Sequence, residues 1–150
     1  MITKEHIRKL AENHITGTGI FLVEVRLSST GRITVLIDRH EGVTIDDCSA
    51  LSRYIHNELG EQADEYELNV SSPGLDMPLL VIEQYRKNEG RMVEVIASDG
   101  TREKGRMMNV TEGGFDLSVD KKEKKKETVT VLKPYNFEDV KSVKVIISFK

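Results

Sequence analysis

The sequence predicts an α+β protein, with an N-terminal α-β-β-α-β domain over residues 1–80 and a five-stranded β-barrel domain over residues 81–150. Two helical patterns and three strand patterns share the first half of the chain. Five short alternating segments, separated by turn residues, fill most of the second half, and closure into a barrel would remove their exposed edges. Residues 66–79 contain two of the three prolines and mark the joint.

The N-terminal domain opens with an amphipathic helix and a hairpin. Thr3 is suited to cap the helix, and Gly17 or Gly19 to end it. Its apolar face carries residues spaced by three and four, namely Ile7, Leu10, Ala11, His14 and Ile15. Residues 20–27 and 33–37 then alternate around the turn residues 28–31, which predicts two antiparallel strands with one buried face.

A second helix and a third strand complete this domain. Thr44 and Asp47 approximate a capping box at the start of the helix, and Gly60 is the expected stop. Residues 66–70 alternate again and predict a strand. We therefore expect both helices to cover one face of a small sheet.

The second domain begins with a short helix around residues 80–87. Alternation and turn residues then predict strands over residues 93–97, 102–110, 115–119, 128–132 and 143–149. A polar loop over residues 121–126 separates the third strand from the fourth, and a single turn over residues 134–140 precedes the fifth.

Composition narrows the possible classes of protein. The longest fully apolar runs have four residues, far fewer than the roughly 20 that span a bilayer, and the first residues lack the apolar core of a signal peptide. Cys48 is the only cysteine, so an internal disulfide is excluded and the reducing cytosol is expected. The four histidines lie on scattered elements, without a zinc-binding spacing, so we expect neither a metal nor a cofactor.

The formal net charge of −3 hides a difference between the halves. Residues 1–80 hold seven Lys and Arg against 13 Asp and Glu, whereas residues 81–150 hold 15 against 12. This change of sign is compatible with two surfaces for different partners, and also with two ordinary solvated surfaces.

Two residue types invite a catalytic interpretation. Cys48 lies in the first turn of the second helix, where the dipole could activate a thiol, but its place in the apolar stripe favours a small buried hydrophobe. Ser71 and Ser72 precede Pro73-Gly74, yet the glycine that an esterase elbow requires before the serine is missing. These serines are better explained as the end of a strand in a tight turn, and we expect no enzymatic activity.

Basic side chains of the second domain are candidate contacts for the phosphates of a structured RNA, because each neutralised phosphate strengthens binding in a salt-dependent way. Such a run of lysines is also typical of a solvated turn that resists aggregation. The candidates are Arg102, Arg106, Lys121, Lys122, Lys124, Lys125 and Lys126.

Residues 66–79, with the sequence Tyr-Glu-Leu-Asn-Val-Ser-Ser-Pro-Gly-Leu-Asp-Met-Pro-Leu, closely resemble the signature of the RimP family of bacterial ribosome maturation factors. Residues 42–53, 90–95 and 137–143 also resemble this family, in the same order along the chain. Its signature residues here, expected to form a contact surface between the domains, are Asn69, Ser71, Ser72, Pro73, Gly74, Leu75 and Asp76.

The resemblance implies an SH3-like, Sm-like barrel after the α+β domain. It also implies a non-catalytic, monomeric factor that binds the immature 30S subunit through ribosomal RNA and a small-subunit ribosomal protein near the decoding region. Met77 departs from the family pattern, since most members carry Arg there, and this puts an ionic contact at that position in doubt. Alternatives are an Sm-like regulator of small RNAs, which would form rings, and a serine hydrolase.

Overall fold

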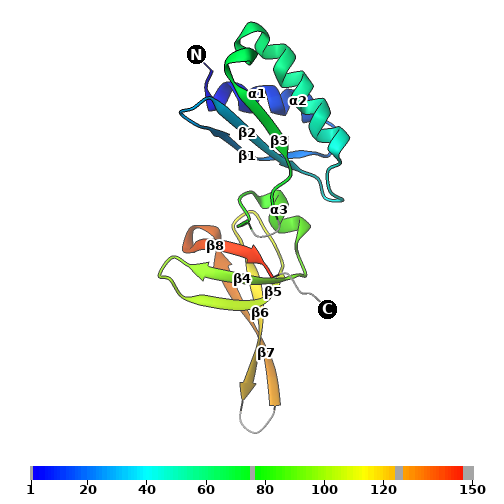
Figure 1. The fold of residues 1–150 in the computed structure, drawn as a ribbon. Coiled ribbons are helices and arrows are strands. Elements are labelled where there is room, and N and C mark those ends of the chain that lie inside the picture. Colours follow the sequence, from blue (N-terminus) through cyan, green and yellow to red (C-terminus); the bar gives the residue numbers. More distant parts are fainter. Residues whose placement is uncertain (1, 75–76, 124–126, 147–150) are drawn as a thin grey trace. The chain divides into compact units, whose positions relative to one another are not determined.

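The computed structural model describes residues 2–74, 77–123 and 127–146 (Figure 1). The chain divides into two compact units, Met1–Gly74 and Leu75–Lys150, and each has its own apolar core. The division falls within residues 66–79.

The first unit has the predicted order of helices and strands (Figure 1). Strands β1 and β2 form an antiparallel hairpin, and β3 lies parallel to β2, so the sheet order is β1-β2-β3. The elements are α1 (Lys4–Ile15), β1 (Phe21–Leu27), β2 (Arg32–Asp38), α2 (Ile45–Leu59), the 3-10 turn η1 (Gly60–Glu65) and β3 (Glu67–Ser71).

Local chemistry explains the ends of both helices. The Thr3 hydroxyl accepts a hydrogen bond from the His6 N–H at 3.1 Å, which satisfies one of the free donors at the start of α1. At α2, the Thr44 hydroxyl accepts from the Asp47 N–H at 3.0 Å, and the Asp47 carboxylate accepts from the Thr44 N–H at 2.9 Å. Both predicted caps are therefore confirmed, while α1 ends at Ile15, before the two glycines.

Both helices contribute to one core with the sheet. The fully buried side chains at its centre are Ile7 of α1, Ile33, Val35 and Ile37 of β2, and Leu51 and Ile55 of α2. The two helices also contact each other, which is the predicted arrangement of helices against one side of the sheet.

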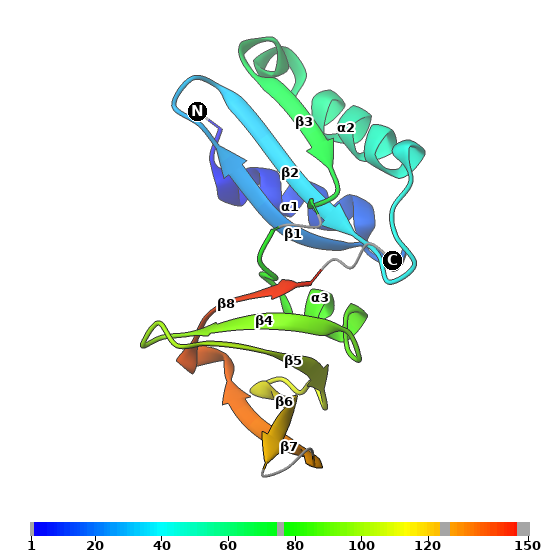
Figure 2. The ribbon, with the colours of Figure 1, turned by 60° about the horizontal axis from the view of Figure 1, so that its bottom comes forward.

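The second unit contains a six-residue helix and an antiparallel sheet of five strands in the order β7-β6-β5-β4-β8 (Figure 2). No β7–β8 ladder is present among the described residues, so the sheet is open there. The elements are α3 (Ile82–Lys87), β4 (Met92–Ala97), β5 (Arg102–Met108), β6 (Gly114–Glu123), β7 (Glu127–Asn136), the 3-10 turn η2 (Phe137–Asp139) and β8 (Val140–Val145).

Several predicted boundaries in this unit are wrong, most clearly those of β6, β7 and the turn before β8. β6 continues to Glu123, into the predicted polar loop. β7 continues through Pro134 to Asn136 instead of ending at residue 132. Proline is tolerated because β7 is an edge strand within the described part of the chain, where one row of its N–H groups has no strand partner. The turn is consequently reduced to η2, and β8 starts at Val140.

Polar side chains cross the inner side of this sheet. The Glu103 carboxylate on β5 accepts from Tyr135 Oη at 2.9 Å and pairs with Lys133 Nζ at 2.8 Å, and both partners lie on β7. Because β6 lies between these strands in the sheet order, the sheet must curve for the side chains to meet.

Candidate functional site

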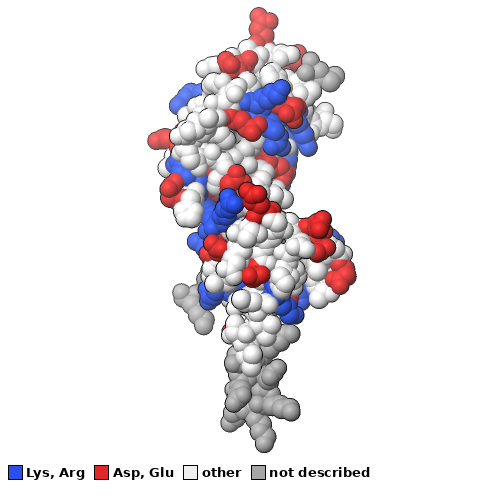
Figure 3. Space-filling model, turned by 180° about the vertical axis from the view of Figure 1, so that it is seen from behind, with Lys and Arg blue, Asp and Glu red and all other residues white. Residues whose placement is uncertain are grey.

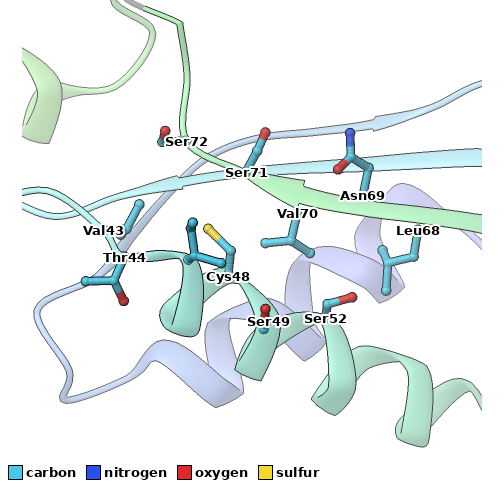
Figure 4. A pocket seen from close by; sticks show the side chains of 11 residues that line it. Val43, Thr44, Cys48, Ser49, Ser52, Leu68, Asn69, Val70, Ser71 and Ser72 are labelled. Carbon is cyan, nitrogen blue, oxygen red and sulfur yellow. The ribbon is translucent and has the colours of Figure 1, made fainter.

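A groove in the first unit lies between the N-terminal half of α2 and strand β3 (Figure 4). It has a volume of about 370 Å³. Leu68 and Val70 point from β3 toward α2, whereas Asn69 and Ser71 point away from it (Figure 4). The lining residues are Val43, Thr44, Ile45, Cys48, Ser49, Ser52, Leu68, Asn69, Val70, Ser71 and Ser72.

The lining is uncharged and combines an apolar floor with small polar groups. Leu68, Val70 and Cys48 are partly buried against the core of the unit. Ile45, in contrast, is 84% exposed at the first position of α2, next to its capping residue Thr44. The groove therefore offers apolar contact and hydroxyl groups, but no Lys, Arg, Asp or Glu side chain.

The structure places three of the predicted signature residues in this groove: Asn69, Ser71 and Ser72. Asn69 and Ser71 belong to β3, while Ser72 follows its end. Pro73 is partly buried and Gly74 exposed just beyond the groove. Leu75 and Asp76 lie outside the described residues.

Neither the serines nor the cysteine of the groove has a catalytic setting. The lining contains no His, Asp or Glu that could act as a base for Ser71 or Ser72. Burial, followed by the negative charge of Asp47, raises the pKa of the Cys48 thiol, so the thiol stays protonated rather than activated. Cys48 is half-buried, less than predicted, because it lies at the groove.

In the second unit, strand β5 presents a row of cations. Arg102, Lys104 and Arg106 alternate with inward-facing residues and are all exposed. Arg102 lies 3.8 Å from the Glu94 carboxylate, and Arg106 Nη1 donates a hydrogen bond to the Gly90 carbonyl. We call Arg102, Lys104 and Arg106 the β5 basic row.

Two members of the β5 basic row, Arg102 and Arg106, are sequence-predicted contacts. Lys104 was missed, although the two-residue spacing of the three cations within a strand was the signal that could have found it. Lys121 and Lys122 lie on β6, but their side chains, like residues 124–126, are outside what the structure describes. On the face drawn in Figure 3, basic and acidic side chains are interspersed over the described residues.

Comparison with known proteins decides the family. The model of the RimP N-terminal domain matches residues 10–76. A ribosome maturation factor RimP of Porphyromonas gingivalis is 35% identical over 79% of this chain and 78% of its own. Those of Cytophaga hutchinsonii and Christiangramia forsetii are 34% and 32% identical, over 87% and 97% of this chain and 87% and 99% of their own. The chain belongs to the RimP family.

The RimP N-terminal domain match covers all of the groove's lining residues, from Val43 to Ser72. It ends one residue before Met77, the departure from the family pattern, and Met77 is partly buried. The relatives that extend over nearly the whole chain also cover the β5 basic row. Family membership thus applies to both candidate surfaces.

Two further features concern membranes and metals. None of the helices among the described residues is long and apolar enough to cross a membrane. Within the same residues, His, Cys, Asp and Glu side chains form no group of three or more that could hold a metal ion.

Proposed function

We propose that this protein binds the immature small (30S) ribosomal subunit and promotes its assembly by binding alone, as a monomer in the cytoplasm. Its relatives bear the name ribosome maturation factor RimP. The observation that carries the proposal within this chain is the β5 basic row, three exposed cations on one face of one strand.

The β5 basic row suits the backbone of structured ribosomal RNA. Alternate side chains of a strand are spaced by roughly 7 Å and point to the same side, so the three cations can contact successive phosphates. Single-stranded bases stack on exposed aromatic side chains, and β5 does not offer these. On β4, the cross-strand partners of the three cations are Ile96, Glu94 and Met92. Lysines of residues 121–126 extend the basic surface in this proposal.

We further propose that the five strands belong to an SH3-like barrel. The contacts of Glu103 with Lys133 and Tyr135 support strong curvature, because they join β5 to β7 across the inner side of β6. In such a barrel the β5 basic row lies on the outside and remains available to RNA.

Sedimentation of cell lysate tests the function. We expect the protein to migrate with precursors of the small subunit at low salt, and its absence from those fractions would refute the proposal. A variant with Arg102→Gln, Lys104→Gln and Arg106→Gln should dissociate from the precursors at lower salt. The salt dependence of its binding should correspond to up to about three fewer phosphate contacts.

The matched control removes three cations from the other unit: Lys4→Gln, Arg8→Gln and Lys9→Gln on α1, all of which are exposed. This control should bind precursors like the unmodified protein. Light scattering separates the proposal from the Sm-like alternative, since a ring would have several times the mass of the 17.0 kDa chain.

A further inference from the structure

Strand β3 is an edge of its sheet, and among the described residues it pairs only with β2. Successive residues of a strand direct their N–H and C=O groups to opposite sides. Alternate residues of β3 therefore present backbone donors and acceptors away from β2. Such an edge is a template for a further strand, and proteins commonly use it to bind extended peptides.

The groove runs directly along this edge. Because α2 connects the parallel strands β2 and β3, it runs antiparallel to β3. One end of the groove is formed by Ser52 and Leu68, and the other by Thr44 and Ser72 (Figure 4). A strand added beside β3 would place every second side chain over the apolar floor and the exposed Ile45, and the others toward solvent.

Charge favours a basic occupant over a nucleic acid. Residues 1–74 hold seven Lys and Arg against 12 Asp and Glu. Three of these cations already pair with carboxylates: Arg26 with Glu24, Arg32 with Glu67, and Arg39 with Asp47 and Glu41. The groove lining itself has no cation for a phosphate, whereas Asp46 is exposed at the start of α2, beside Ile45.

We propose that the groove between β3 and α2 binds an extended, basic polypeptide segment, which adds to the sheet as a strand beside β3. Side chains of that segment alternate between apolar residues that enter the groove and basic residues that point to solvent, and the net negative charge of residues 1–74 favours a basic segment over an acidic one. This inference rests on the proposed function, because the segment would belong to a protein component of the immature subunit.

A synthetic seven-residue peptide of alternating lysine and valine, blocked at both ends, is the probe. In a strand the valines direct their N–H groups to one edge and the lysines to the other. N-methylation of the valines and N-methylation of the lysines therefore block opposite edges. NMR titration of the full chain should show shifts in the amides of residues 68–72 and of α2, and one methylated peptide should bind at least about tenfold more weakly than the other.

Ile45→Lys should weaken binding of the unmethylated peptide about fivefold, because an apolar contact is lost and the new lysine repels the lysines of the peptide. Leu132→Lys is the matched control, because it also replaces an exposed apolar side chain (53%) with lysine, on β7. It should leave the affinity unchanged.

Three results would overturn the strand addition: no shift of these amides at 1 mM peptide, equal binding of the two methylated peptides, or binding of a single-stranded oligouridylate in place of the peptide. Sedimentation keeps the two proposals apart. If the unmodified protein migrates with the precursors but the peptide does not bind as predicted, only the strand addition is wrong. If the protein does not migrate with the precursors, the proposed function fails whatever the peptide does.

Discussion

Arg39 and Asp47 join the end of β2 to the first turn of α2, with 3.1 Å between Arg39 Nη1 and Asp47 Oδ2. The same Asp47 carboxylate closes the capping box with Thr44. One side chain thus positions the start of the helix over the sheet, and with it the groove-lining residues Thr44 and Ile45.

The stability of the first unit should depend on pH through Asp47. The hydrogen bond from the Thr44 N–H, supported by the Thr44 hydroxyl and Arg39, lowers the pKa of Asp47. The contribution of the Asp47 carboxylate to stability is therefore present above the unfolded pKa of roughly 3.9 and is lost as the pH falls through the lower pKa of the folded state. Asp47→Asn should lower the melting temperature at pH 7, and the difference should shrink in acid.

Asp46→Asn is the control for Asp47, because it removes an exposed carboxylate of the same turn that makes no capping bond. If Asp46→Asn lowers the melting temperature at pH 7 as much as Asp47→Asn does, the role assigned to Asp47 is contradicted.

Alkylation of Cys48 should be slow in the folded protein. Burial and then the charge of Asp47 raise the pKa of its thiol, so little thiolate is present at pH 8. Asp47→Asn removes the second cause, which should lower this pKa and speed the reaction with iodoacetamide. The rate is to be measured against pH under conditions where the melt shows a folded protein; an unchanged rate would argue against the influence of Asp47.

Gly114→Ala should destabilise the second unit by about 1–3 kcal/mol or more, since 1–3 kcal/mol is the usual cost of overpacking. Gly114 is buried at the start of β6, and an added methyl group would collide with the backbone carbonyl of Tyr135 on β7. Gly113→Ala is the matched control, since a methyl group there meets no atom within 4 Å. Denaturant unfolding should separate the two variants, and equal midpoints would disprove this account.

Tyr135 should ionise later than an ordinary tyrosine. Burial is the main cause that raises its pKa, followed by the hydrogen bond to Glu103 and the charge of that carboxylate. Glu103→Gln keeps an acceptor but removes the charge, so the pKa of Tyr135 should fall. Absorbance titration at alkaline pH measures this change, with Tyr135→Phe identifying the transition. An unchanged pKa of Tyr135 in Glu103→Gln would show that the charge of Glu103 does not contribute to the shift.

Elements with local signals were predictable from the sequence. The caps at Thr3 and Thr44 depend on residues three positions apart, and the hairpin of β1 and β2 depends on alternation around a short turn. Local signals failed where neighbouring strands decide the structure. Pro134 reads as a turn residue, yet β7 passes through it because only one of its edges must pair.

The sequence by itself determined the family, the order of helices and strands in the first unit and the sign of charge in each half, because these follow from residue identity and short-range spacing. Only the tertiary structure decided that β3 pairs parallel to β2 and, among the described residues, leaves an edge beside α2, and that the face of β5 with Arg102, Lys104 and Arg106 is exposed. Strand partners and solvent exposure depend on residues far apart in the chain, so no local pattern specifies them.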